Sequence, residues 1–304
     1  MSKWTADLIG DLTGKRIIIT GATHGIGYAA AEALAARGAD LIIAVRNRAR
    51  GEHSVEKIKE KSPGASVMAM HLDLTDLDIV KHFADEVTAR FDRLDVLINN
   101  AGVMVPPHKI TRSGFELQFG TNHLGHFALT AQLLPLLMAT PLSRVVSTSS
   151  IAARRAKIHF DNLDGRNGYN PMTFYRQSKL ANLLFAIDLQ HRLERAGSST
   201  ISVACHPGIT VTNLLSRGSG KETGRVMKTL MRIVAQPASM GSLPTLYAAT
   251  HPDLRGGEYI GPDGPGNTKG YPVLTNDPAR LYKPDLAARL WEVSEELTGV
   301  RYII

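Results

Sequence analysis

The stretch TGATHGIG, residues 20–27, follows a short apolar run and leads into a segment with helical periodicity. Glycines let a chain turn sharply and bring backbone N–H groups close to a ligand, and a helix N-terminus adds partial positive charge. The spacing is G-x-x-x-G-x-G, which differs from the G-x-G-x-x-G of the general dinucleotide fingerprint. The pattern favours a phosphate-binding turn, and an ordinary strand-to-helix turn is the alternative.

Outward from this loop, short β-branched runs alternate with longer amphipathic segments. Each run is almost continuously apolar, as expected for parallel strands that are covered on both faces. We therefore expect an α/β fold: a doubly wound (Rossmann), mostly parallel seven-stranded sheet with helices on both faces. The expected strands are Arg16–Thr20, Asp40–Val45, Ser66–His71, Leu94–Ile98, Arg144–Thr148, Ile201–Cys205 and Glu258–Ile260.

The expected helices include Ile26–Arg37, Thr75–Arg90 and Phe174–Arg195. Thr75 and Asp78 are spaced as in a capping box, with Asp in place of the usual Glu or Gln. In an open sheet of this kind, ligands bind beyond the carboxyl ends of the strands. The functional residues are therefore expected in the loops that follow the strands.

The composition fits a single globular unit with a sizeable core, since 43% of the 304 residues are hydrophobic and 21% are charged. No Pro/Gly/Ser-rich linker, charge run or repeat divides the sequence, so we expect one catalytic domain over residues 1–304. The lone cysteine, Cys205, lies in an apolar run and excludes an intrachain disulfide, which fits a reducing compartment.

Several classes of function are disfavoured. The net charge of +7 is scattered among acidic residues rather than clustered, so no nucleic-acid partner is expected. No run approaches the roughly 20 apolar residues of a membrane-spanning helix, and we expect a cytoplasmic protein without a membrane span. No His/Cys pair has metal-ligand spacing with an obvious partner, so no metal is expected. The G-x-S-x-G elbow of serine hydrolases does not occur.

Three further motifs occur where the predicted strands end or a long helix begins: NNAG at 99–102, YRQSK at 175–179 and HPG at 206–208. Together with the glycine loop, they resemble the short-chain dehydrogenase/reductase family over residues 20–212. The strings NHLGHF at 122–127, SKLAN at 178–182 and LWEVS at 290–294 narrow the resemblance to the retinol-dehydrogenase-like branch. Many animal members of that branch begin with a membrane anchor, and residues 1–7 of this sequence do not resemble one.

The tyrosine and lysine of YRQSK point to acid–base chemistry. Hydride transfer to a carbonyl needs a proton donor, and a free tyrosine has a pKa near 10. Lys179 lies four residues after Tyr175, so both share one helix face, and its ammonium is expected to lower the pKa of the phenol. The resemblance implies that Lys179 also binds the nicotinamide ribose and that Asn122 helps hold a water. It assigns the substrate oxygen to Ser150, with Ser149 as the alternative.

The residues after the second predicted strand decide the expected cofactor. NAD-preferring relatives carry an acidic residue there, which binds the ribose hydroxyls. Here Arg46 takes that place, with Arg48 close by, and His24 adds a basic side chain to the glycine loop. A charged hydrogen bond to a 2′-phosphate favours NADP(H) over NAD(H), while two solvated surface cations are the alternative.

The family pattern implies further cofactor contacts. Asp73 and Leu74 match the position that flanks adenine, although Asp73 also suits a turn or helix cap. Thr212 matches the position at the nicotinamide carboxamide, with a helix cap as the alternative. The full expected cofactor set is Gly21, Thr23, His24, Gly25, Ile26, Gly27, Arg46, Asp73, Leu74, Asn99, Asn100, Ala101, Gly102, Tyr175, Lys179, Pro207, Gly208 and Thr212.

The sequence thus predicts an NADP(H)-dependent oxidoreductase that acts on a lipophilic aldehyde or ketone, or on the corresponding alcohol. Segments near 151–174 and 210–236 are expected to line the substrate cleft, the second as a lid with an apolar inner face. The small substrate is the expected partner, and a homo-oligomer is compatible with the sequence. The alternative function is a catalytically idle dinucleotide sensor or scaffold on the same fold.

Overall fold

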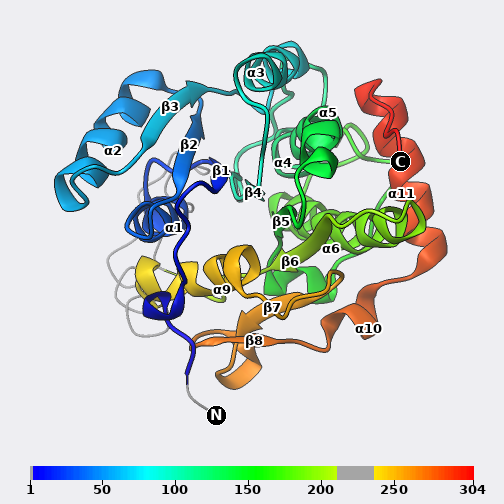
Figure 1. Cartoon of the computed structure of the whole chain (residues 1–304). Coiled ribbons are helices and arrows are strands. Elements are labelled where there is room, and N and C mark those ends of the chain that lie inside the picture. Colours follow the sequence, from blue (N-terminus) through cyan, green and yellow to red (C-terminus); the bar gives the residue numbers. More distant parts are fainter. Residues whose placement is uncertain (1–2, 211–235) are drawn as a thin grey trace.

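The computed structural model describes residues 3–210 and 236–304. One eight-stranded sheet runs through these residues in the order β3-β2-β1-β4-β5-β6-β7-β8 (Figure 1). Strands β1 to β7 pair in parallel with their neighbours, and β8 pairs antiparallel with β7. The strands are β1 (Arg16–Thr20), β2 (Asp40–Val45), β3 (Val67–His71), β4 (Val96–Asn99), β5 (Arg144–Thr148), β6 (Ile201–Cys205), β7 (Tyr259–Pro262) and β8 (Pro272–Leu274).

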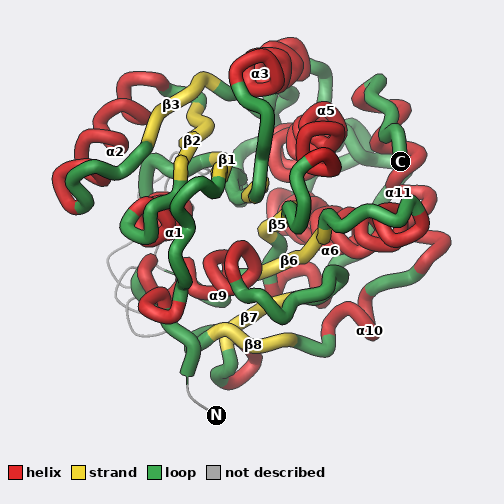
Figure 2. The backbone as a smooth tube through the Cα atoms, viewed as in Figure 1, coloured by secondary structure: helices red, strands yellow, loops and turns green. Residues whose placement is uncertain are grey.

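Helices connect the strands and cover both faces of the sheet, as Figure 2 shows with strands in yellow between helices in red. The α-helices are α1 (Gly25–Ala35), α2 (Arg48–Lys61), α3 (Leu77–Arg90), α4 (Leu117–Phe119), α5 (Gly125–Ala139), α6 (Pro171–Arg195), α9 (Ala238–Thr250), α10 (Asp277–Leu281) and α11 (Pro284–Thr298). Short helical turns are η1 (Ala6–Leu8), η2 (Gly120–Leu124), η3 (Ile151–Arg155) and η4 (Pro265–Asn267). Among the described helices, none is long and apolar enough to cross a membrane.

The predicted doubly wound fold is confirmed, but the strand count is corrected from seven to eight. Each of the seven predicted strands overlaps an observed one. Strand β8 was not predicted because it has only three residues, and Val273 and Leu274 are exposed there. A short antiparallel edge strand lacks the continuous apolar run that marks a strand buried on both faces.

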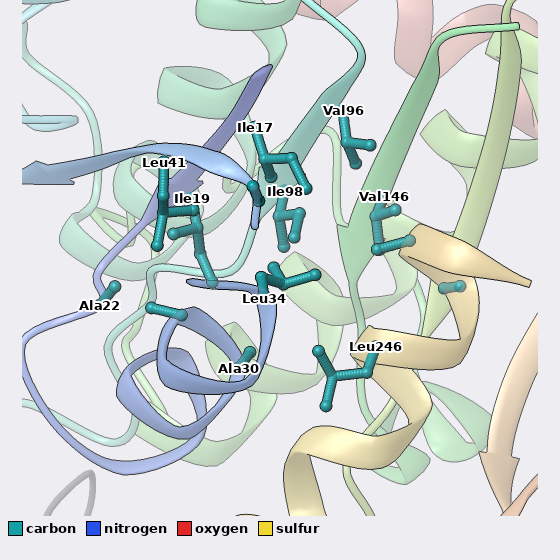
Figure 3. Packing of buried hydrophobic residues seen from close by; sticks show 14 of the residues in the cluster. Ile17, Ile19, Ala22, Ala30, Leu34, Leu41, Val96, Ile98, Val146 and Leu246 are labelled. Atoms are coloured by element: carbon teal, nitrogen blue, oxygen red, sulfur yellow. The ribbon is translucent and has the colours of Figure 1, made fainter. Parts of the chain in front are cut away.

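Two apolar clusters hold the helices against the sheet. On one face, β-branched and leucine side chains of β1, β2 and β4 meet α1 and α9. Figure 3 shows Ile19 and Ile98 of the sheet near Leu34 of α1 and Leu246 of α9. On the other face, α3, α5 and α6 pack on the remaining side of the same strands. Both faces are therefore dry, which is why the strand sequences are apolar throughout.

The predicted capping box at the start of α3 is wrong. The structure has Asp76 as the N-cap, and its carboxylate accepts the backbone N–H of Asp78. Thr75 instead donates its hydroxyl and its backbone N–H to Asp73. A carboxylate two residues back captures both Thr75 donors, so the helix begins later than the sequence pattern predicts.

The order of the strands creates a switch point at the carboxyl ends of the central strands β1 and β4. The chain continues from β1 to β2 on one side of this point and from β4 to β5 on the other. At such a switch point the loops beyond the carboxyl ends diverge and leave room for a ligand. The glycine loop and the NNAG motif lie at this point.

Candidate active site

The glycine loop packs directly against the loop after β4. A Cβ atom on Gly21, whose φ is +72°, would lie 2.9 Å from Ala101. A Cβ atom on Gly27 would lie 2.5 Å from the side-chain nitrogen of Asn100. Both contacts are too close for a side chain, so the two loops approach each other only because these positions are glycine. The result is a backbone-lined cradle at the N-terminus of α1.

The hydroxyl of Thr20, the last residue of β1, holds the two loops together. It accepts the backbone N–H groups of Asn100 and Ala101, each at 2.9 Å. The Asn100 side chain returns a hydrogen bond to the Thr20 carbonyl at 2.7 Å. Since buried backbone N–H groups must find acceptors, these bonds fix the position of the NNAG backbone relative to the glycine loop.

A cavity of about 440 Å³ runs from this cradle across the carboxyl ends of the strands. Its size suits a ligand much larger than a metal ion or a small acid. Sequence-predicted residues line much of it: Gly21, Thr23, His24, Gly25, Ile26, Gly27, Arg46, Asp73, Leu74, Asn100, Ala101, Gly102, Tyr175, Lys179 and Pro207.

Two cations lie at the β2 end of this cavity. Arg46 follows β2, and Arg50 is on the first turn of α2, which Asn47 caps by accepting the Arg50 backbone N–H at 2.9 Å. Among the residues that the structure describes, neither guanidinium is paired with a carboxylate. Arg48 differs, because it is 75% exposed and pairs with Glu52 at 3.0 Å.

Arg50 is a site residue that the sequence reasoning missed. Its signal was the helix start: α2 begins at Arg48, two residues after Arg46, and Arg50 is on its first turn. Arg48, which the sequence suggested instead, points away from the cavity and toward Glu52.

Other predicted positions lie where the structure gives them a second task. Asp73 lines the cavity, and its carboxylate also accepts both donors of Thr75. His24 lines the cavity as the N-cap residue of α1, with its ring Nδ1 3.0 Å from the Thr23 hydroxyl. Asp73 can therefore stabilise the turn and also contact a cofactor.

Two predicted cofactor residues are placed differently. Asn99 is buried, and its amide donates to Thr130 on α5 at 2.9 Å rather than toward the cavity. Gly208 has φ +66° and packs so tightly that a Cβ atom would lie 2.3 Å from the Thr268 carbonyl oxygen. Neither is among the residues that line the cavity. Thr212 lies outside the described residues.

Tyr175 and Lys179 enter the cavity from α6. Asn170 caps this helix by accepting the Thr173 N–H, and Pro171 occupies its first position, which fixes where the helix starts. The Lys179 Nζ lies 6.0 Å from the centroid of the Tyr175 ring. It donates to the carbonyl oxygen of Thr148 at the end of β5, at 3.0 Å.

Burial controls the proton affinities of this pair. It lowers the pKa of Lys179 to about 8, because the ammonium is removed from water; the nearby Cys205 acts in the opposite direction. Burial also raises the pKa of Tyr175, and hydrogen bonding with Ser150 opposes that rise. The prediction that the Lys179 ammonium lowers the pKa of Tyr175 below its usual range is therefore wrong for the protein alone, in which desolvation of the phenol dominates.

The two serines after β5 have different environments. Ser149 is 1% exposed, and its hydroxyl donates to the Lys179 carbonyl oxygen at 2.6 Å. Ser150 is half-buried, interacts with Tyr175, and caps η3 by accepting the Ala152 N–H at 3.2 Å. Ser149 lines the cavity, but its donor is used within the core; Ser150 is not among the lining residues, and its hydroxyl is the one that is hydrogen-bonded with the tyrosine.

Asn122 lies on the π-helical turn η2, a feature that is frequent at functional sites. Its side chain is fully buried and binds the backbone of Val103 twice, accepting the N–H at 2.8 Å and donating to the carbonyl at 3.0 Å. It also donates to Ser178 at 2.9 Å. Asn122 thereby joins the loop after β4 to α6, between Tyr175 and Lys179.

The apolar end of the cavity is formed by Val103, Met104, Pro106 and Leu117. The loop that carries the first three is anchored by Gln118, which accepts the Val105 N–H at 2.9 Å. Apolar residues of the expected cleft segment 151–174 instead pack in a cluster with α6 and α11. Residues 211–235 of the other expected segment lie outside the described residues.

A family model described as short chain dehydrogenase matches residues 15–222. This chain belongs to that family. The short-chain dehydrogenase is accordingly an oxidoreductase that acts on CH–OH or C=O groups and binds a nicotinamide dinucleotide. The match includes β1 to β6 and every residue described above as lining the cavity.

Characterised relatives place this short-chain dehydrogenase in the retinol-dehydrogenase-like branch. It is 36% identical to retinol dehydrogenase 14 of Homo sapiens over 96% of this chain and 88% of that protein. Retinol dehydrogenase 12 of Mus musculus is 37% identical, again over 96% of this chain and 88% of the relative.

Solved structures share the fold. An uncharacterised protein from Mycobacterium paratuberculosis has a TM-score of 0.82 and 38% identity, with both chains covered completely. A short chain dehydrogenase of Escherichia coli CFT073, solved with NADPH, has a TM-score of 0.65 and 24% identity over 84% of this chain and 98% of that one. The second likeness concerns the fold alone.

We predict that Lys179→Met stabilises the protein at neutral pH in the absence of dinucleotide. The folded pKa of Lys179, about 8, lies below the usual lysine value, so below pH 8 the folded state carries a buried ammonium at a cost. The linkage corresponds to roughly 3 kcal/mol. The advantage of the variant over wild type should shrink from pH 8 toward 10.5, as measured by urea unfolding. The exposed Lys59→Met is the control, and a less stable Lys179→Met at pH 7 would contradict the prediction.

We also predict opposite phenotypes for the two serines. Ser150→Ala removes the donor beside Tyr175 and should lower kcat by about 10²-fold with little loss of stability. Ser149→Ala removes a bond to the α6 backbone and should cost about 1 kcal/mol in unfolding free energy. Steady-state kinetics and thermal unfolding of both variants separate the effects. A larger fall in kcat for Ser149→Ala would move the assignment to that serine.

Proposed function

We propose that the protein is an NADP(H)-dependent oxidoreductase that converts lipophilic aldehydes or ketones and the corresponding alcohols. The observation that carries the proposal is the set of side chains that line one cavity. It holds two cations that lack a carboxylate partner in the described residues at one end, and a buried tyrosine with a lysine at the other. The glycine-lined cradle between them fits the pyrophosphate of a dinucleotide.

The chemistry divides between the dinucleotide and the chain. When bound, the reduced nicotinamide supplies the hydride that the carbonyl carbon receives. Tyr175 donates its phenolic proton to the carbonyl oxygen in reduction and takes it back in alcohol oxidation. The Ser150 hydroxyl donates a hydrogen bond to the same oxygen and stabilises the negative charge that develops there. Ser150 follows β5 and Tyr175 is on α6, and the hydrogen bonding between them places both side chains where they can bind one oxygen atom together.

Lys179 has an electrostatic role in this scheme. Its pKa near 8 keeps most of the amine protonated at neutral pH, and the Thr148 carbonyl oxygen holds the ammonium in place. A positive charge in a buried site favours the phenolate form of Tyr175, which opposes the effect of burial on that pKa. Asn122 binds Val103 and Ser178, and it thereby fixes the loop after β4 relative to α6, which carries Tyr175 and Lys179.

The charges at the β2 end support NADP(H) as the cofactor. A 2′-phosphate adds negative charge to the adenosine ribose, and Arg46 and Arg50 both line that end. Guanidinium groups bind phosphate oxygens through two parallel hydrogen bonds. An acidic residue, which would bind the free ribose hydroxyls of NAD(H), is absent from positions 44–50.

The apolar end of the cavity supports a lipophilic substrate. Val103, Met104, Pro106 and Leu117 present hydrocarbon there, and Lys109, whose carbonyl oxygen accepts the Leu117 N–H, is the one charged residue among their neighbours in the cavity lining. Relatives at 36–37% identity are named retinol dehydrogenases, and retinol is a long apolar alcohol. A screen of NADPH oxidation over retinal and over aliphatic, aromatic and polycyclic carbonyls tests the proposal. Tight NADPH binding without turnover of any of them would favour an idle sensor instead.

We predict that Tyr175→Phe lowers kcat by more than tenfold and leaves the dissociation constant for NADPH nearly unchanged. The phenylalanine ring keeps the packing of a residue that is only 6% exposed, and only the proton donor is lost. Fluorescence titration measures the dissociation constant for NADPH, and steady-state assays measure kcat. A variant that retained more than a tenth of the wild-type kcat would remove Tyr175 from the reaction.

A second prediction concerns cofactor choice. Arg46→Ala and Arg50→Ala should each raise KM for NADPH by about tenfold and hardly change KM for NADH, because each loses one charged bond to phosphate. Arg48→Ala is the matched control: its guanidinium pairs with Glu52, and KM should change less than about twofold. A wild type that prefers NADH, or equal effects of all three substitutions, would exclude the proposed phosphate site.

A further inference from the structure

His126 connects two parts of the site without lining the cavity itself. It lies on α5, one helical turn after Asn122, and is 3% exposed. Its Nδ1 lies 3.0 Å from the Asn122 carbonyl oxygen, and its Nε2 lies 2.9 Å from the Thr20 hydroxyl. One imidazole therefore bridges the π-helical turn η2 and the end of β1.

The direction of both hydrogen bonds follows from the available donors and acceptors. A carbonyl oxygen can only accept, so Nδ1 carries the proton and donates to Asn122. Burial lowers the pKa of His126 to about 4, and the ring is therefore neutral with a lone pair on Nε2. Nε2 accepts the hydroxyl proton of Thr20.

This assignment explains how Thr20 can hold the NNAG backbone. Its hydroxyl proton goes to His126, so both oxygen lone pairs face the backbone N–H groups of Asn100 and Ala101. The other acceptor near that hydroxyl is the Ile98 carbonyl oxygen, at a longer 3.4 Å. Without an acceptor at position 126, the hydroxyl would turn toward Ile98, and its lone pairs would no longer match both amides.

The second bond acts on the catalytic end. The Asn122 carbonyl is oriented by His126, and the Asn122 side chain holds Val103 on both its backbone groups. A Cβ atom on Gly102 would lie 3.0 Å from Asn122 Oδ1 and 3.6 Å from Lys179 Nζ, which shows how closely these groups are packed. A shift of the π-helical turn would therefore move groups next to the Lys179 ammonium.

We propose that His126 is a positioning residue that couples the dinucleotide cradle, through its Nε2, to the Asn122 turn beside Lys179, through its Nδ1. The inference rests on the proposed oxidoreductase function and adds a residue that does not touch substrate or cofactor. It assigns a different kinetic consequence to each ring nitrogen. Nε2 supports dinucleotide affinity, and Nδ1 supports kcat.

Two polar substitutions distinguish the roles of the two ring nitrogens. In His126→Asn, the side-chain amide N–H takes the place of Nδ1–H, so the Asn122 bond is kept and the Thr20 acceptor is lost. In His126→Gln, the longer side chain places its carbonyl oxygen near the position of Nε2, so the Thr20 acceptor is kept and the Asn122 bond is lost. Both variants stay polar and smaller than histidine, and thermal unfolding reports whether each one folds.

A crossed pattern is expected. His126→Asn should raise the dissociation constant for NADPH by about five- to tenfold and keep kcat within about threefold, as one lost hydrogen bond allows. His126→Gln should keep the dissociation constant within about threefold and lower kcat by about tenfold. Fluorescence titration of NADPH with the protein measures the first quantity without turnover, and kcat is measured at saturating NADPH.

His123 provides the matched control. It is also buried, at 1% exposed, and lies three residues before His126, but its Nε2 contacts Ser294 on α11. His123→Asn and His123→Gln should lower the melting temperature and change the dissociation constant for NADPH by less than about twofold; their kcat values measure what disturbance of η2 does by itself. These variants report what disturbance of a buried histidine does without the connection to the cradle.

Parallel losses in both His126 variants, or effects no larger than those at His123, would overturn the coupling and leave His126 with a packing role. Failure of the proposed function has a different signature. In that case wild type itself would turn over no carbonyl with NADPH, while the affinity arm of the experiment would still test the Nε2 bond.

Discussion

The hydroxyl of Thr20 occupies the point at which β1 and β4 diverge, and it satisfies two backbone N–H groups of the neighbouring loop. The glycine loop and the NNAG loop can only approach as closely as Gly21 and Gly27 permit, so the hydroxyl bonds and the missing side chains depend on each other. Leaving either amide unpaired in this buried place would cost about 1–3 kcal/mol. The dinucleotide cradle and, through His126, the Asn122 turn depend on this one contact.

A second constraint is the dry environment of the reacting groups. Lys179 is fully enclosed and is held by a backbone carbonyl, which satisfies one donor of the ammonium but supplies no counter-charge. Such an arrangement costs stability, and a functional site commonly retains it because the same desolvation strengthens electrostatic interactions with the substrate. The phenol of Tyr175 is affected in the opposite direction, since burial disfavours its charged form. Burial therefore moves the proton affinities of the two groups apart: the pKa of Lys179 falls to about 8, and the pKa of Tyr175 rises above its usual value.

The two arginines at the β2 end, Arg46 and Arg50, show how the start of a helix determines which cations line the cavity. Asn47 caps α2, and this cap places Arg50 on the first turn, where it lines the same cavity as Arg46. Arg48, two residues closer in sequence to Arg46, projects from another side of the same turn and pairs with Glu52. The set of cations that line the cavity therefore depends on where the helix begins as well as on which residues carry charge.

Much of the fold was predictable because its signals are local. A parallel strand buried on both faces must be apolar along its whole length, so seven strands were found, whereas the half-exposed β8 carries no such pattern. Glycine at 21 and 27 and the Tyr175–Lys179 spacing are likewise local, since turns and helix faces repeat over a few residues. Asn99 shows the limit, because its motif suggested a cofactor contact and its side chain lies toward Thr130.

The sequence by itself determined the succession of the seven buried strands along the chain and the glycine loop, and it proposed Tyr175 and Lys179 as the acid–base pair. Only the tertiary structure decided which of the two serines contacts Tyr175, that Arg50 rather than Arg48 lines the cavity with Arg46, and that burial governs the pKa of Tyr175. These outcomes depend on which segments meet in space. Desolvation and competition for hydrogen-bond partners arise only when distant segments pack together, so the spacing of residues along the chain does not encode them directly.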